Sequence, residues 1–309
     1  MDPQGRPGLA ETLFVWALWG LVALAVFITY WRIPPSELYH TSGTGPPAGA
    51  SRVVVYLGYP VAIAAVPLAF IAAARVGTRF AYAAAAVATL LCFTIGIPGV
   101  IDQGDLDARP VNGLAAVGVG VALALTVAAL VRHGVGNSAP WSTADWLRGV
   151  AAVVLVLVAL PWIFAELGFY VSDAPLLGSI FMAKEVVPSP GGEPSLHAVH
   201  LGSHHGMDGT ALAISALALF RVPRQLASLA GRIALNAYLS LLLVYGLANA
   251  LQDFWTEQLV KRGSVSAVIP SLIRPSASWA WAAILVAALA ICLAVSRVAR
   301  VDPGQRGGG

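Results

Sequence analysis

The chain has 309 residues, of which 58% are hydrophobic and only 11% charged, and its formal net charge is +3. Its mean hydropathy is +0.78. Because a soluble domain carries about a quarter charged residues, this composition excludes an ordinary soluble enzyme and predicts an all-α integral membrane protein.

Apolar runs of about 20 residues recur along the chain, and each can cross roughly 30 Å of hydrocarbon as a helix. The first run lacks a small-residue cleavage site and is expected to stay as an anchor. We predict one polytopic membrane domain over residues 1–303 and a disordered tail at 304–309. The domain should be a bundle of about eight transmembrane helices, near residues 11–31, 53–74, 80–100, 113–131, 149–169, 201–221, 233–253 and 277–296.

Basic residues predict the orientation of this bundle. An even number of spans places both termini on one side, and a cytoplasmic N-terminus assigns most of the 18 basic residues to the cytoplasm, including those of loops 75–79 and 221–232. We therefore predict cytoplasmic N- and C-termini in the cell (plasma) membrane. The basic residues are scattered at span ends, so they should meet anionic membrane lipid, and no nucleic acid is expected.

Histidines gather on the predicted outer side, most densely in residues 194–210. If this segment is helical throughout, four potential ligands share an arc of about 80°, with a further histidine beside them. Several imidazoles near a carboxylate are typical of a zinc, iron or copper site. The predicted ligands of such a divalent metal are His197, His200, His204, His205 and Asp208.

Candidate catalytic residues lie near the same predicted membrane face. Glu166 and Tyr170 are one turn apart at the outer end of the fifth span, and they suit a general base with a phenol partner. Asp208 would act as a ligand or as an orienting carboxylate. Ionisable residues are costly in hydrocarbon, so they are functional candidates there. The favoured function is a metal-dependent membrane hydrolase or oxidoreductase that acts on a lipid or small amphiphile at the outer leaflet.

The spacing His197-x2-His200-x3-His204-His205 resembles one histidine box of the membrane desaturases and hydroxylases. Those enzymes need further boxes on other segments, and the rest of this chain has none. The combination of Glu166 with several histidines is also loosely similar to seven-helix membrane zinc amidohydrolases, without their spacing. Each resemblance covers only a short part of the chain, so no family is assigned.

Three other interpretations stay open. The histidine segment can instead be an amphipathic surface helix with its imidazoles among lipid headgroups. The chain can also be a transporter or permease for a metal or small solute, or a non-catalytic membrane assembly factor. A transport path needs polar groups across the membrane or a broken helix near its midplane. The inner halves of the predicted spans hold no paired charge below Asp208, so transport ranks below the enzyme.

Overall fold

A computed structural model describes residues 6–33, 42–100, 107–137, 140–167, 180–181, 186–187, 196–197, 199 and 205–301. Helices dominate this part of the chain. They are α1 (Ala10–Arg32), α2 (Gly45–Leu57), α3 (Pro60–Val76), α4 (Arg79–Cys92), α5 (Pro110–His133), α6 (Thr143–Glu166), α8 (His205–Leu219), α9 (Leu229–Phe254) and α10 (Trp279–Val301).

Shorter elements join these helices. Turns of 3-10 helix follow α4 (η2, Phe93–Gly96) and α8 (η4, Pro223–Gln225), and a π-helical turn (η5, Trp255–Val260) extends α9. The connection between α6 and α8 holds one antiparallel pair of two-residue strands, β1 (Val186–Val187) and β2 (Leu196–His197). The prediction of an all-helical protein is therefore confirmed for the described residues apart from this short pair.

Several long apolar helices indicate a multi-pass membrane protein. Six described helices are long and apolar enough to cross a membrane: α1, α4 with η2, α5, α6, α9 with η5, and α10. The pair α2–α3 is bent by 52° and would be a seventh span. The predicted sixth span becomes α8, which has 15 residues and a length of about 22 Å. Among the described residues, six helices or seven with the bent pair are long enough to span a membrane, so the predicted number of eight is not confirmed.

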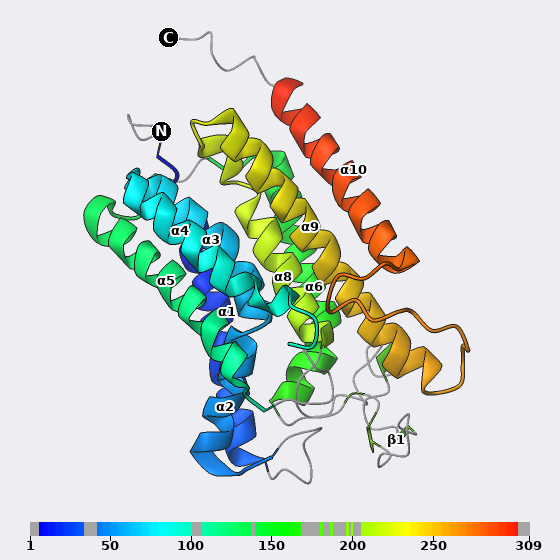
Figure 1. Ribbon diagram of the computed structural model, residues 1–309. Helices are drawn as coiled ribbons and strands as arrows, with labels where there is room; N and C mark the ends of the chain where they lie inside the picture. The colour runs from blue at the N-terminus through cyan, green and yellow to red at the C-terminus, as the bar shows by residue number, and fades with distance from the viewer. Residues whose placement is uncertain are drawn as a thin grey trace.

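When the bent pair α2–α3 is taken as one span, successive spans run in alternating directions, and the start of α1 and the end of α10 lie at the same end of the bundle (Figure 1). We call this the termini end and the opposite one the far end. Main-chain contacts tie the connections together at the termini end: the amide of Leu9 donates to the carbonyl of Val135 at 2.8 Å, and that of Gly8 donates to the Gln225 side chain at 2.7 Å. The termini end is the one predicted to be cytoplasmic.

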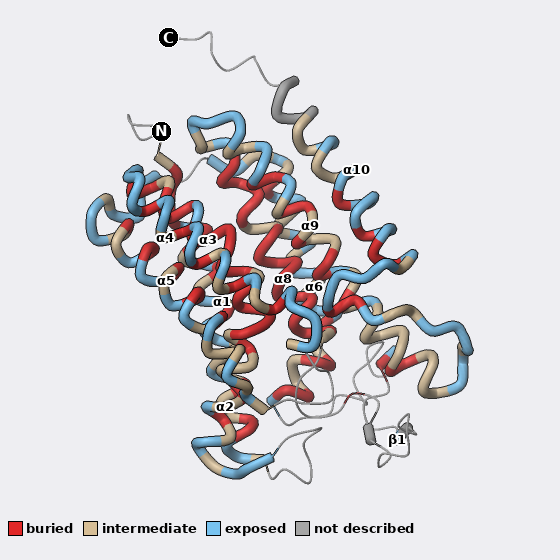
Figure 2. Tube along the Cα trace, viewed as in Figure 1, coloured by how far each residue is buried: buried red, intermediate tan, exposed pale blue. Residues whose placement is uncertain are grey.

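The core lies along α3 and α8, which are buried over most of their length, whereas α6 and α10 expose apolar faces (Figure 2). Large exposed side chains such as Val150 on α6 and Val286 on α10 belong to these outer faces, and Leu90 is exposed on α4 in the same way. An apolar exterior around a packed interior is what a lipid environment favours.

Close packing of α8 on α9 positions the N-terminal half of α8. At Gly246 a Cβ atom would stand 2.5 Å from the carbonyl oxygen of Gly209, and at Gly209 a Cβ would stand 2.8 Å from the amide nitrogen of Ala250. These contacts leave no room for a side chain on either helix. Small residues at helix crossings allow such approach in membrane bundles.

Candidate functional site

The far end of the bundle holds two buried carboxylates that the sequence singled out. Glu166 is the last residue of α6 and is 0% exposed, and Asp208 lies in the first turn of α8 and is 2% exposed. His205 is described as well, one turn before Asp208 on α8. Tyr170, His200 and His204 lie outside the described residues.

The condition for a single histidine stripe, one continuous helix over residues 194–210, is not met where the structure describes this segment. Leu196 and His197 belong to strand β2, where His197 pairs with Val186, and α8 begins only at His205. A strand has a period of two residues, so His197 cannot share a helical face with Asp208. Among the described residues of this segment, His205 and Asp208 lie together on α8.

Gly206 brings α8 close to α6. A Cβ atom at this position would clash with the indole ring of Trp162, which is itself 3% exposed. Trp162 precedes Glu166 by one turn of α6, so this contact places the start of α8 beside the end of α6. The two carboxylates thus reach one region from helices that run in opposite directions.

The two helix ends create different electrical environments for these carboxylates. Asp208 stands at the positive N-terminal end of α8, which favours a negative charge, whereas Glu166 stands at the negative C-terminal end of α6. The Thr29 hydroxyl of α1 donates a hydrogen bond to the main-chain carbonyl of Glu166. This carbonyl belongs to the last turn of α6, where main-chain acceptors have no partner within the helix. A negative charge on Glu166 therefore needs a cation nearby.

Arg52 supplies a buried cation to this region. It is 2% exposed, and its guanidinium lies over the rings of Tyr30 and Tyr56, at 5.1 and 5.5 Å from their centroids. The Tyr56 hydroxyl is within electrostatic range of Arg52, Glu166 and Asp208. We call these five residues, Tyr30, Arg52, Tyr56, Glu166 and Asp208, the polar cluster.

A break in the helical path adjoins the polar cluster. Pro60 starts α3 two residues after Gly58, and Tyr59 between them has φ −132° and ψ −89°, outside the helical region. The rings of Tyr59 and His205 meet edge-on, with their centroids 6.3 Å apart. Its hydroxyl lies 2.7 Å from that of Tyr245. Because Tyr245 donates to the carbonyl of Ile273 at 2.8 Å, Tyr59 is the donor between the two tyrosines.

A non-helical segment that follows α9 packs back against Tyr245 and Gln252 of that helix. Leu272 and Ile273 are buried, and the Gln252 side chain holds the same segment by donating to the carbonyl of Pro270 at 2.7 Å.

Phe181, from the connection between α6 and α8, packs edge-on against Trp162, and the centroids of the two rings are 4.9 Å apart. Phe181 belongs to the same buried apolar cluster as Tyr30, Tyr56 and Trp162, so the connection between α6 and α8 packs beside the polar cluster.

The residues that the structure describes do not by themselves form a metal site. No group of three His, Cys, Asp or Glu side chains is close enough to hold a metal ion among them. His205 and Asp208 supply two donors, and Arg52, in the same electrostatic environment, opposes a second positive charge. A metal there would need ligands from His197, His200 or His204, whose side chains lie outside the described part.

Sequence reasoning missed Arg52 and the tyrosines around it. The second span was predicted to start at residue 53, so Arg52 was taken as a loop residue. A signal was present: Arg52 and Tyr56 are four residues apart, and Gly58 and Pro60 follow directly, which favours a helix break next to a shared polar face.

Comparison with known proteins gives no relative to guide the assignment. No family model, no curated protein and no solved structure matches this chain.

Proposed function

We propose that this chain is a membrane enzyme of the cell membrane whose active site is the polar cluster. The observation that carries the proposal is that two buried carboxylates on separate helices, Glu166 and Asp208, lie in the same electrostatic environment as the buried cation Arg52, which stands over the ring of Tyr56. Charged groups are expensive inside a bilayer protein and are retained where they bind or react with a substrate. The predicted orientation places this site at the outer leaflet, with a lipid or small amphiphile as its substrate.

The environment of each carboxylate suggests its role. Asp208 is favoured as a fixed anion by the start of α8, so it suits binding and orientation of a polar group. Glu166 at the end of α6 is the carboxylate whose charge the helix opposes, so it is the better proton acceptor and donor. Arg52 would hold an anionic or carbonyl oxygen of the substrate while the proton moves.

A divalent metal, such as zinc, iron or copper, is a further part of the proposal. Its ligands would be His197, His200, His204 and Asp208, with His205 alongside. Such an ion would supply Lewis-acid chemistry and a hydroxide near neutral pH. Elemental analysis of the purified protein beside a His197→Ala/His204→Ala variant tests this: about one equivalent lost in the variant supports the metal, and equal content in both refutes those ligands.

The proposed activity is tested by comparing lipids from cells that produce the wild type with those from cells that produce isosteric variants. Glu166→Gln and Asp208→Asn should abolish any new lipid product seen by mass spectrometry, because each removes a charge while keeping the shape of the side chain. Glu257→Gln is the matched control, since Glu257 lies beyond α9 in an ion pair with Lys261 at 2.8 Å. Identical lipid profiles for wild type and Glu166→Gln would refute the enzyme.

A transporter is the second candidate, and the broken helix favours it. The 52° bend between α2 and α3 lies between Tyr56 and Pro60, beside the polar cluster. Discontinuous helices next to buried charges are typical of ion and substrate sites in secondary transporters. Uptake of a metal or small solute into proteoliposomes, lost in Asp208→Asn with no lipid product in cells, would favour transport over the enzyme. Without uptake and without turnover, the assembly-factor interpretation would lead.

A further inference from the structure

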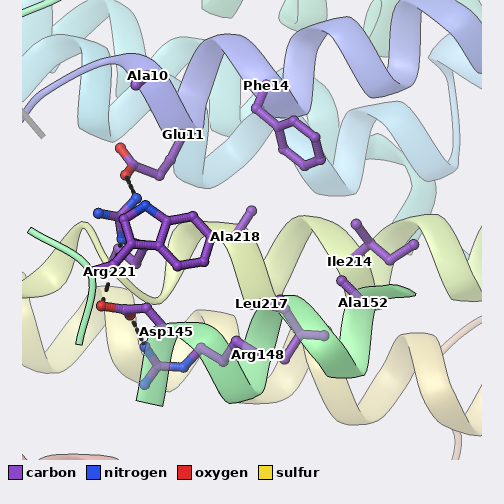
Figure 3. Close-up of a pocket in the computed structure, with 12 residues that line it drawn as sticks. Ala10, Glu11, Phe14, Asp145, Arg148, Ala152, Ile214, Leu217, Ala218 and Arg221 are labelled. Atoms are coloured by element: carbon purple, nitrogen blue, oxygen red, sulfur yellow. Dashed lines mark hydrogen bonds and ion pairs between the residues drawn. The ribbon is translucent and has the colours of Figure 1, made fainter. Parts of the chain in front are cut away.

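A second charged site lies at the termini end, away from the polar cluster. There a cavity of about 280 Å³ lies between the first turns of α1 and α6 and the last turns of α8. Figure 3 shows that its charged side chains gather on one side, where Glu11, Arg221, Asp145 and Arg148 are joined by ion pairs. The apolar side chains Phe14, Ala152, Ile214 and Leu217 line the rest.

The charged side is a compact ion-pair network with an excess of cations. Arg221 contacts Glu11 at 2.6 Å and Asp145 at 3.7 Å, while Arg148 and Arg224 reach Asp145 at 2.8 and 2.6 Å. Three guanidinium groups thus face two carboxylates. Asp145 has no exposed side-chain surface, but Arg148 and Arg224 are 22% and 39% exposed. The excess positive charge is therefore at the accessible edge of the network.

The cavity changes from polar to apolar with depth in the bundle. Glu11, Asp145 and Arg221 stand at the helix ends, whereas Ile214 lies seven residues before Arg221 on α8, about 10 Å deeper. A cavity polar at the membrane surface and apolar toward its middle has the same polarity profile as a lipid. Its volume is near the lower limit of roughly 300 Å³ for small-molecule pockets, which suits a headgroup with the first part of one chain.

The cavity lies beside the lipid-facing surface. Phe14 and Trp141 line it and are 51% and 53% exposed. The guanidinium carbon of Arg221 lies 4.9 Å from the centroid of the Trp141 ring. The rings of Trp141 and Trp146 pack together with their centroids 4.9 Å apart. Exposed tryptophans at the end of a span mark the headgroup level of a bilayer.

We propose that this cavity is a binding site for an anionic phospholipid of the surrounding leaflet. The lipid phosphate would lie on Arg148, which lines the cavity, and on Arg224, which lies outside the lining but shares Asp145 with Arg148. Both guanidinium groups present several N–H donors suited to phosphate oxygens. One acyl chain would follow Phe14, Ala152 and Ile214 into the bundle. The ion pairs of Asp145 hold these arginines in place before the lipid arrives, so less ordering is required on binding.

The test is native mass spectrometry of the full chain in detergent, titrated with phosphatidylglycerol or with zwitterionic phosphatidylcholine. The wild type should retain one phosphatidylglycerol molecule about tenfold more tightly than phosphatidylcholine, because a charge-assisted contact contributes one such factor or more. Arg148→Gln should remove this preference. Arg79→Gln is the matched control, because Arg79 is exposed at the start of α4 at the same end and does not line the cavity.

Arg148→Gln also removes an ion pair, so a second variant keeps the test independent of folding. Ala152→Phe fills the apolar part of the cavity and leaves every ion pair intact, and it should weaken phosphatidylglycerol binding by about tenfold as well. Equal affinity of the wild type for both lipids, or unchanged binding in Ala152→Phe, would overturn the proposal. Displacement of the lipid by inorganic phosphate alone would overturn the part played by the acyl chain.

Discussion

The contact between Gly209 of α8 and Gly246 of α9 allows a quantitative prediction. A Cβ atom at Gly246 would stand 2.5 Å from the Gly209 carbonyl oxygen and 2.8 Å from the Ala213 amide nitrogen. Both neighbours are backbone atoms, which cannot rotate away, so the helices must separate by about 1 Å to restore ordinary contact. Gly246→Ala should therefore destabilise the bundle.

The expected size follows from two opposing terms. Overpacking against backbone costs about 3 kcal/mol, at the upper end of the usual range, and alanine regains about 1 kcal/mol of helix propensity relative to glycine. The net loss is about 2 kcal/mol for Gly246→Ala, and Gly209→Ala meets the same obstacle. The double variant should lose less than the sum of the two, because one separation of the helices relieves both contacts.

Thermal unfolding in detergent micelles measures this effect. Gly246→Ala should lower Tm by about 4 °C or more. Gly120→Ala is the control, because Gly120 lies within α5 with no neighbouring atom within 4 Å of its added Cβ. This variant should keep or raise Tm. A Gly246→Ala protein as stable as Gly120→Ala, or a double variant that shows full additivity, would refute the packing argument.

Two further predictions concern buried polar contacts. Tyr59→Phe removes the donor of the 2.7 Å contact to Tyr245, and it should cost about 1 kcal/mol in the same unfolding assay, while Tyr82→Phe on the exposed side of α4 should cost nothing measurable. Glu11→Gln removes the 2.6 Å ion pair of Arg221 and keeps its longer 3.7 Å contact to Asp145. The substitution should lower the free energy of unfolding by about 2 kcal/mol and lower Tm. An unchanged Tm would mean that the pair contributes no net stability.

The long apolar spans could be predicted from the sequence because hydrocarbon imposes their length and composition. The predicted span at 113–131 falls within α5, and the predicted span at 277–296 starts two residues before α10 and otherwise lies within it. The break between α2 and α3 was missed because residues 53–74 are apolar throughout, and hydropathy does not register a change of direction at Gly58 and Pro60. Local backbone chemistry, not polarity, sets this bend.

Contacts between charged residues that lie far apart in the sequence could not be predicted from composition. Glu11 and Arg221 stand at the ends of the predicted spans 11–31 and 201–221, and nothing in the sequence joins one to the other. The structure pairs them across 210 residues of sequence. Likewise Glu166 and Asp208 were both selected as candidates, but the cation beside them comes from α2, and no spacing rule connects Arg52 to either one.

The Glu11–Arg221 pair also sets an order for assembly of the bundle in the membrane. Glu11 emerges with the first helix, yet its partner is synthesised 210 residues later. At about 5 to 20 residues per second, this delay is about 10 to 40 s. During that time the carboxylate of Glu11 stays at the membrane surface, and α1 has no ionic attachment to α8. The ion pair between α1 and the end of α8 therefore forms only after α8 has been made, whereas contacts such as that of Trp16 with Thr126 of α5 can form earlier. A nascent chain released before Arg221 would lack this ionic attachment of α1.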